Sequence, residues 1–162
     1  MIPVVESINQ YSALLGRFLY ETNVKIIWMK KVLFVCHGNI CRSAMAEYMF
    51  KNKYPGVPCE SRAVSNEEIG NDIYPPAKRC LDRHNIPYTR HYAKRITQKD
   101  YDGYDLIYVM DRSNMYYINR IVNDTDKKIH MLCDRDVDDP WYTGDFDGVY
   151  YQIDEALDRI EL

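Results

Sequence analysis

Short apolar runs alternate along the chain with segments whose apolar residues recur at helical spacing. Strands are predicted at residues 32–35, 58–61, 106–110 and 129–132, and most of these runs are strongly apolar. Uniformly apolar strands are typical of a parallel sheet that is covered by helices on both faces. The pattern therefore predicts an α/β fold: a single domain with a four-stranded parallel sheet and helices on both faces.

The intervals between these strands carry the signals of helices. Proline suits the first turn of a helix, and Pro75 is followed by a helical pattern that continues to Arg83. Thr97 is expected to cap a short helical turn over 98–101. Further helices are predicted at residues 43–54, 113–122 and 149–160, with a long loop before the last of them.

The first 28 residues precede the first predicted strand and carry two acidic and two basic side chains. Their apolar residues are spaced for an amphipathic helix over 7–20, with Ser7 as its cap. A secretory signal or membrane span is not expected, because the segment lacks both a basic start and a long apolar run. We expect residues 1–28 to be either an added helix or the product of a start site placed upstream of Met29.

The overall composition predicts a globular domain with one hydrophobic core, and it does not suggest a strongly charged binding partner. Hydrophobic residues make up 46% of the chain, and the net charge of −3 suggests no nucleic-acid or anionic-membrane partner. Five cysteines stand at irregular spacings without a Cys-x-x-Cys pair. This pattern predicts neither a disulfide framework nor a metal site, and it favours the reducing cytoplasm.

The loop between the first predicted strand and helix reads Cys36-His37-Gly38-Asn39-Ile40-Cys41-Arg42-Ser43. A helix N-terminus presents unpaired N–H groups and a partial positive charge, so a loop folded over it can hold an anion. The same field stabilises a thiolate and makes Cys36 a candidate nucleophile. Gly38 permits the tight turn that aims successive amides inward. A phosphate-binding loop is therefore expected after the first strand.

Two side chains that follow Cys36 strengthen this interpretation. Arg42 can grip two phosphoryl oxygens with its planar guanidinium, and Ser43 is expected to hydrogen-bond the sulfur and to cap the helix. A lone cysteine at a strand end is usually a small buried apolar residue. The spacing of Cys36, Gly38 and Arg42 between a strand and a helix argues against that simpler interpretation here.

A second segment supplies the carboxylate that phosphoryl transfer requires. A departing oxygen needs a proton donor, and hydrolysis of the resulting thiophosphate needs a base. Residues 138–142 read Asp-Asp-Pro-Trp-Tyr, with Pro140 stiffening the loop and Trp141 and Tyr142 offering walls for an aromatic substrate. An acidic loop alone is more often a solvated turn, so its significance depends on the Cys36 loop.

From Lys31 to the end, the chain resembles the low-molecular-weight protein tyrosine phosphatases. The motifs that carry the resemblance are Val-Cys-His-Gly-Asn-Ile-Cys-Arg-Ser at 35–43, Met-Asp-x-Ser-Asn at 110–114 and Asp-Pro-Trp-Tyr at 139–142. The resemblance implies that residues 29–162 form a catalytic domain. It also implies hydrolysis of phosphotyrosine in proteins through a cysteinyl-phosphate intermediate, without a metal or another cofactor.

The same resemblance assigns roles to individual residues. It implies that Cys36 is the nucleophile, that Arg42 clamps the phosphate and that Asp139 is general acid and then base. Supporting roles fall to the residues that brace the loop and its neighbours: Asn39, Ser43, Ser61, His91 and Asp111. Cys41 matches a cysteine that can trap Cys36 as a reversible disulfide, and a cysteine packed under the loop is compatible with that role.

Three positions depart from the family pattern. Ala44 follows Arg-Ser where proline is usual, Arg62 stands where a small residue is common, and Glu67 occupies a rim position that is aromatic in several animal members. His37 is expected to face the same rim, and Glu67 is expected to form part of the substrate wall with Trp141 and Tyr142. These departures concern specificity and leave the chemical groups in place.

Three other functions fit the sequence less well. An arsenate reductase on the same loop needs a relay of two further cysteines, and Cys59, Cys80 and Cys133 are too widely spaced to form it. A protein-arginine phosphatase typically has threonine where Ile40 stands. A non-catalytic phosphotyrosine-binding module would lack one of the three catalytic groups. The expected partners are tyrosine-phosphorylated proteins and a cognate tyrosine kinase, with the chain a monomer or weak dimer.

Overall fold

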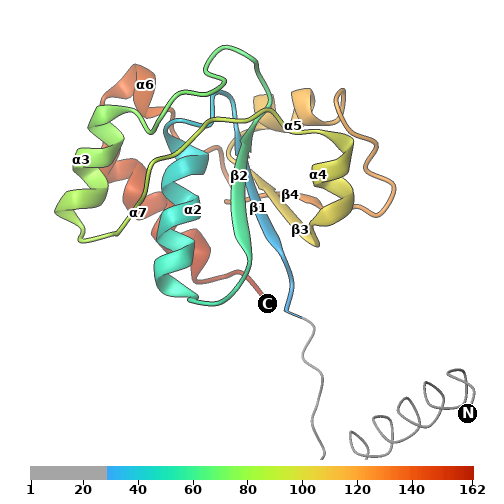
Figure 1. The fold of residues 1–162 in the computed structure, drawn as a ribbon, viewed down its shortest axis with the longest axis horizontal. Coiled ribbons are helices and arrows are strands. Elements are labelled where there is room, and N and C mark those ends of the chain that lie inside the picture. The colour runs from blue at the N-terminus through green and yellow to red at the C-terminus, as the bar shows by residue number, and fades with distance from the viewer. Residues whose placement is uncertain (1–28) are drawn as a thin grey trace, which may run out of the picture.

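A computed structural model of the chain describes residues 29–162, and the helix predicted over 7–20 lies outside the described residues. The sheet contains β1 (Val32–Cys36), β2 (Cys59–Ala63), β3 (Leu106–Val109) and β4 (Ile129–Met131). All neighbouring strands are parallel, in the order β2-β1-β3-β4. The predicted fold class, a four-stranded parallel sheet with helices on both faces, is confirmed (Figure 1).

Strand β1 divides the apolar core into two layers. Successive side chains of a strand point to opposite faces, so Val32 and Phe34 enter one cluster while Leu33 and Val35 enter the other. The first cluster is covered by α2 (Arg42–Lys53), α3 (Pro75–Arg83) and α7 (Phe146–Leu157). The second is covered by α4 (Gln98–Gly103) and α5 (Arg112–Ile118). Burial on both faces explains why β1 is apolar at every position.

The strand order places a crevice at the carboxyl end of β1. The chain leaves β1 for β2 on one side of it, and β3 lies on the other side. Connections that diverge from a central strand leave such a crevice in open parallel sheets, and ligands bind there. The loop of residues 37–41 follows β1 directly and opens into α2. The topology therefore puts the loop singled out from the sequence at the position where this fold holds ligands.

Several predicted boundaries are wrong. The long loop before the last helix contains the short helix α6 (Pro140–Thr143), which Gly144 ends in a left-handed conformation at φ 73°. Helix α7 begins at Phe146 and not at residue 149, because the Asp145 side chain caps it by accepting the N–H of Gly148. Helix α5 is capped by Asp111 and ends at Ile118, four residues before the predicted end.

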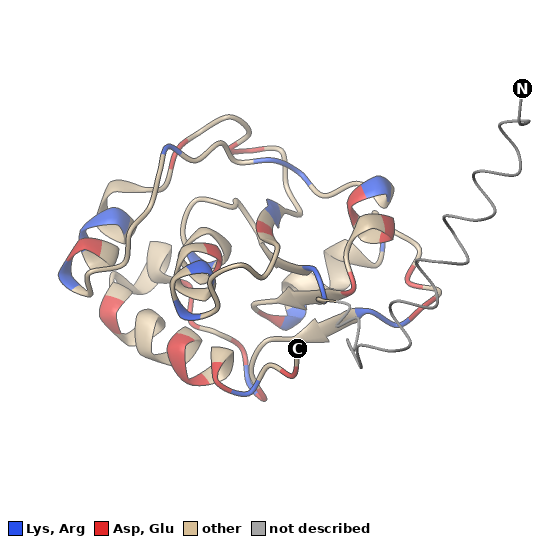
Figure 2. Cartoon of the chain, turned by 60° about the horizontal axis from the view of Figure 1, so that its bottom comes forward, with Lys and Arg blue, Asp and Glu red and all other residues tan. Residues whose placement is uncertain are grey.

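Charged side chains are distributed over the whole described domain. Figure 2 shows Lys and Arg interspersed with Asp and Glu along the elements. Helix α3 ends with a basic residue, and α7 has an acidic residue in its first turn. Among residues 29–162, no helix has the length and apolar character required for a membrane crossing.

Candidate active site

Cys36 is the last residue of β1, and its sulfur lies at the mouth of the loop. The residue is 3% exposed, and its Sγ accepts the N–H of Asn39 at 3.3 Å. Ser43 Oγ lies 3.0 Å from the same sulfur, and it must be the donor when the sulfur is a thiolate. Helix α2 begins without a side-chain cap at Cys41, so its first N–H groups remain free to face an anion. This is an environment that stabilises negative charge on sulfur and on a ligand.

The capping role predicted for Ser43 is wrong. Ser43 is buried in the first turn of α2, and position Cys41 precedes the helix. Its hydroxyl is already engaged, because it contacts Cys36 Sγ and accepts Asn39 Nδ2–H at 2.9 Å. Ser43 therefore holds the loop against the sulfur, and the other predicted contact, the hydrogen bond to Cys36, is present.

Asn39 fixes the shape of the loop. Its backbone is left-handed at φ 61°, a conformation that asparagine tolerates better than most residues. Its side-chain N–H groups donate to Ser43 Oγ and to Ser61 Oγ at 2.8 Å, and its Oδ1 accepts the N–H of Lys94 at 3.1 Å. Its backbone carbonyl accepts a hydrogen bond from His91 Nε2–H at 2.8 Å. Every polar group of the buried Asn39 side chain thus has a partner that restrains it.

A buried carboxylate that sequence reasoning missed completes this network. Ser61 Oγ donates to Glu47 Oε2 at 2.5 Å, and the second oxygen of Glu47 pairs with Lys51. Glu47 is only 6% exposed and comes from α2. The sequence does hint at a buried carboxylate here, because Glu47 interrupts the otherwise apolar run of residues 44–50. The network links the loop, α2 and β2.

Arg42 lies behind the loop and is held by two carboxylates. One terminal nitrogen donates to Asp111 Oδ2 at 2.6 Å and to the carbonyl of Val137 at 3.1 Å, and the other donates to Asp139 Oδ2 at 2.9 Å. Burial acts to lower the pKa of Arg42, but the negative charges of Cys36 and Asp139 raise it above its ordinary value. Arg42 is therefore a fixed cation at the base of the site.

Asp111 and Asp139 are each positioned by the helix that they cap. Asp111 accepts the N–H of Asn114 at 2.6 Å at the start of α5, and Asp139 accepts the N–H of Trp141 at 3.1 Å at the start of α6. Both use their second oxygen for Arg42. The structure thus brings Asp139 into the same pocket as Cys36 and Arg42, and it places Asp111 beside Arg42.

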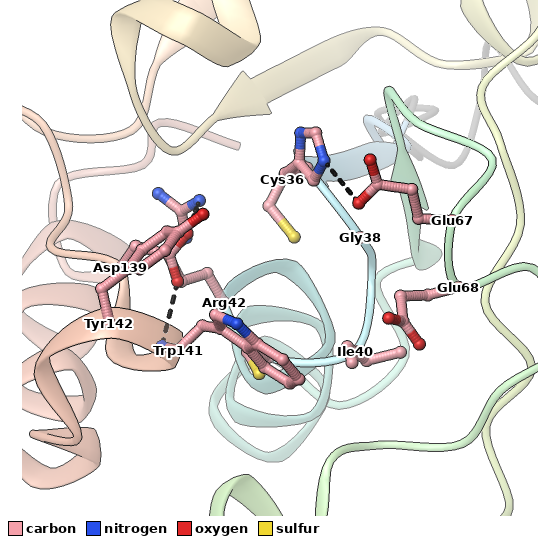
Figure 3. A pocket seen from close by; sticks show the side chains of 11 residues that line it. Cys36, Gly38, Ile40, Arg42, Glu67, Glu68, Asp139, Trp141 and Tyr142 are labelled. Carbon is pink, nitrogen blue, oxygen red and sulfur yellow. Dashed lines mark hydrogen bonds and ion pairs between the residues drawn. The ribbon is translucent and has the colours of Figure 1, made fainter.

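The pocket above the sulfur has one aromatic wall and one polar wall (Figure 3). Trp141 packs against Tyr74 with ring centroids 4.9 Å apart, and Tyr142 is 85% exposed at the rim. Across the pocket, His37 Nε2 lies 3.1 Å from Glu67 Oε2, and Glu68 lies beside Gly38. The predicted wall residues therefore all line one opening, and Glu68 joins them.

Cys41 and Arg62 are buried close to this loop but face different surroundings. Burial first, and then the charge of Cys36, raises the pKa of the Cys41 thiol far above its ordinary value. Arg62 forms ion pairs with Glu60 and Asp100, and these carboxylates balance its charge. Cys41 consequently keeps its proton at neutral pH, and the unusual Arg62 is accommodated without entering the pocket.

The model of the family described as low molecular weight phosphotyrosine protein phosphatase matches residues 31–161. The chain belongs to this family. Among curated members, the human low molecular weight phosphotyrosine protein phosphatase is 39% identical over 140 residues, which cover 76% of this chain and 88% of the human protein. A protein-tyrosine-phosphatase of Staphylococcus haemolyticus is 32% identical over 143 residues, which cover 82% of this chain and 92% of that protein.

Solved structures of other family members share the fold. The low molecular weight protein tyrosine phosphatase of Streptococcus pyogenes is 37% identical with a TM-score of 0.75, over 80% of this chain and 89% of that chain. Wzb of Vibrio vulnificus, solved with benzylphosphonate, is 27% identical with a TM-score of 0.75, over 80% of this chain and 95% of that chain. The family likeness therefore extends through the sheet and the loop after β1.

The buried His91 yields a prediction for the pH dependence of stability. Burial lowers its pKa below the ordinary value, so an unfolded chain takes up this proton at a higher pH than the folded chain. The free energy of unfolding should therefore fall as the pH drops from about 7 through the window below the ordinary histidine pKa of about 6.5. In His91→Gln, whose amide can still donate to the Asn39 carbonyl, this contribution to the slope should vanish.

Urea denaturation at a series of pH values measures the effect. His130→Gln is the matched control, because His130 is exposed on β4. We expect the His130→Gln curve to follow the unmodified protein and the His91→Gln curve to be flatter. Identical slopes for all three proteins would contradict the assignment.

Proposed function

We propose that the protein hydrolyses phosphotyrosine in protein substrates through a cysteinyl-phosphate intermediate. The observation that carries the proposal is that Cys36, Arg42 and Asp139 line one pocket at the start of α2. These side chains supply a nucleophile, a fixed cation and a proton donor. The aromatic wall of Trp141 and Tyr142 suits the ring of the substrate tyrosine.

Substrate binding begins with the phosphate. Its oxygens accept the free N–H groups of the loop and of the first turn of α2, where the helix field favours negative charge. Arg42 takes part through the nitrogen that now donates to Asp139. A planar guanidinium can hold a phosphoryl group in two parallel hydrogen bonds. Phosphate therefore competes with Asp139 for Arg42, and this competition releases the carboxyl group for proton transfer.

The first chemical step transfers the phosphoryl group to sulfur. Cys36 Sγ attacks phosphorus, the S–P bond forms, and the bond from phosphorus to the tyrosine oxygen breaks. Asp139, as the carboxylic acid, gives its proton to that departing oxygen, so that tyrosine leaves neutral. The developing charge on the phosphoryl oxygens is stabilised by Arg42 and by the backbone N–H groups.

The second step regenerates the enzyme. Asp139, now a carboxylate, takes a proton from a water molecule whose oxygen attacks phosphorus. The S–P bond breaks, and inorganic phosphate leaves. Cys36 returns as a thiolate, with the Asn39 N–H and the Ser43 hydroxyl beside it. The two steps use the same carboxyl group first as an acid and then as a base.

The other three functions are less well supported. The cysteine relay of an arsenate reductase is not indicated, because Cys59, Cys80 and Cys133 are spread widely along the sequence instead of lying in one short segment. Ile40 argues against an arginine phosphatase, which typically has threonine at this position. All three catalytic groups of the proposed mechanism are present, so a purely binding role has no structural support.

We infer that the partners are tyrosine-phosphorylated proteins, together with the kinase that phosphorylates them. A cytoplasmic location, which the cysteine content supports, and a monomeric or weakly dimeric state complete the proposal. Glu67 and Glu68 carry negative charge on the rim of the pocket, which supports weaker binding of phosphopeptides with acidic flanks.

The general-acid role of Asp139 is tested with leaving groups of different basicity. In Asp139→Asn, kcat/KM, which covers only the steps up to phosphoryl transfer to sulfur, should fall about 100-fold or more for phenyl phosphate, whose phenolate needs a proton, and much less for para-nitrophenyl phosphate. Asp138→Asn is the matched control, because Asp138 lies next in sequence and bonds Gln152 instead of Arg42. Cys36→Ser should abolish turnover of both substrates. An equal loss on both substrates in Asp139→Asn would argue against proton donation.

We further propose that residues 29–162 suffice for catalysis. The described fold and the family match both lie within this range. A chain that begins at Met29 should retain kcat/KM for para-nitrophenyl phosphate within about twofold and unfold at the same temperature as the full chain. A loss of tenfold or more would assign the first 28 residues a part in the active domain.

The reversible disulfide between Cys36 and Cys41 remains a prediction, and the buried Cys41 thiol gives it a pH dependence. Peroxide oxidises Cys36 to the sulfenic acid with loss of water, and Cys41 sulfur then forms the S–S bond as a second water leaves. Because the pKa of Cys41 is raised, its thiolate is scarce at neutral pH. Disulfide formation should therefore accelerate as the pH rises.

Recovery of activity after peroxide measures this step. The unmodified protein should regain most activity with dithiothreitol, and Cys41→Ser should lose that recovery because the sulfenic acid is oxidised further. Cys59→Ser is the control, since Cys59 is equally buried but belongs to β2 and lies outside the pocket. Full recovery in Cys41→Ser would show that Cys41 does not protect Cys36.

A further inference from the structure

A second group of chemically reactive side chains lies between α3 and α7, outside the catalytic pocket. Cys80 belongs to α3, His84 follows one helical turn later at the end of that helix, and Asp147 lies in the first turn of α7. Asp147 Oδ1 is 3.0 Å from His84 Nε2 and 3.5 Å from Cys80 Sγ. The three donor atoms all lie within 4.8 Å of one another.

We propose that Cys80, His84 and Asp147 bind one zinc ion. Thiolate, imidazole and carboxylate are the three protein ligands that zinc uses, and a water molecule would complete a tetrahedron. With ordinary zinc–ligand bond lengths, the donor atoms of a tetrahedral site are separated by roughly 3.3–3.8 Å. The separations from Asp147 Oδ1, 3.0 Å to His84 Nε2 and 3.5 Å to Cys80 Sγ, are close to these values, and the thiol and imidazole donor atoms lie within 4.8 Å of each other. Side-chain rotation that brings the thiol and the imidazole together would therefore admit the ion.

The surroundings hold two of the ligands in a binding orientation. The His84 ring stacks on Tyr150 with centroids 3.7 Å apart and planes 7° apart. Arg83 donates to Asp147 Oδ2 at 2.7 Å, which leaves Oδ1 directed at the thiol and the imidazole. Partners of this kind orient metal ligands and often set the affinity of a site. Solvent reaches the cluster from the side of Asp147 and His84, whose side chains are 47% and 19% exposed, while Cys80 is buried.

Zinc binding requires a definite movement of protons. Burial first, and then Asp147, raises the pKa of Cys80 to about 12, so the thiol is protonated before zinc arrives. On binding, the S–H bond breaks, the Zn–S bond forms and one proton passes to solvent. Before zinc binds, His84 Nε2–H donates to the Asp147 carboxylate, so on binding this proton leaves Nε2 for solvent, another is taken up at Nδ1, and the Nε2 lone pair binds the ion. The thiolate and the Asp147 carboxylate then balance the two charges of zinc, while the half-exposed Arg83 keeps its contact with Oδ2.

The predicted lack of a metal site rested on the lack of closely paired cysteines in the sequence. Here the ligands come from two helices, and 63 residues separate His84 from Asp147. A zinc ion would tie α3 to α7, and α7 follows the α6 segment that carries Asp139 almost directly. Ligands that bind only the folded state stabilise it, so zinc should raise the unfolding temperature. The inference stands independently of the proposed phosphatase function, because its readout is metal binding.

Cobalt and zinc titrations of the full chain test the site. Cobalt(II) bound to a thiolate gives an intense near-ultraviolet charge-transfer band, and Cys36→Ser is used as the background so that the active-site sulfur cannot contribute. We expect this band in Cys36→Ser and its loss in Cys36→Ser/Cys80→Ser. Cys36→Ser/Cys133→Ser is the matched control, because Cys133 packs against the Gln152 carbonyl away from the cluster. Its band should be unchanged.

A second measurement is needed in case Cys80→Ser does not fold. It is the zinc affinity of variants at the other two ligands, determined by competition with a chromophoric chelator. In the same background, His84→Ala and Asp147→Asn should each weaken zinc binding at least tenfold. Both side chains reach the surface, so these variants should fold. A cobalt band that survives Cys80→Ser, no band at all, or unchanged zinc affinity in both surface variants would overturn the proposal.

Discussion

The buried guanidinium of Arg42 is the interaction on which the architecture of the site depends. Two carboxylates and a backbone carbonyl surround it, and they come from two segments that are distant in sequence: Asp111 at the start of α5, and Val137 and Asp139 in the chain that leads into α6. A buried cation without partners is costly, and removing one partner of such a pair typically costs about 3–5 kcal/mol. Arg42 therefore fixes Asp111 and Asp139 relative to the loop, and in the proposed mechanism it also binds the phosphate.

This sharing of Arg42 requires the loop of residues 37–41 to be rigid. Arg42 can be shared between Asp139 and a phosphate only if the loop does not shift when the partner changes. Asn39 meets that requirement, because its left-handed backbone is held by Ser61, His91 and the Lys94 N–H from behind. Glu47 extends the restraint into α2. Preorganised donors of this kind stabilise developing charge without rearranging during the reaction.

Local patterns in the sequence were enough to predict the strands, the parallel sheet and the loop after β1, since each depends on neighbouring residues. The Pro75 helix and the Thr97 cap were predicted for the same reason. What failed depends on distant partners. Ser43 resembles a helix cap until Asn39 and Cys36 occupy its hydroxyl, and the start of α7 depends on Asp145 reaching Gly148. Glu47 acquires its role only when Ser61 of β2 packs against α2.

The cysteines show how surroundings decide what a thiol can do. Burial raises the pKa of Cys41, Cys59 and Cys133, each of which lies within or against the apolar core. Cys36 is as buried as Cys59 by exposed fraction, yet its sulfur faces a backbone N–H and a hydroxyl at a helix start. Cys80 instead faces a carboxylate, which repels a second negative charge unless a cation joins them. One fold thus separates a thiol suited to attack phosphorus from a thiol suited to hold a metal.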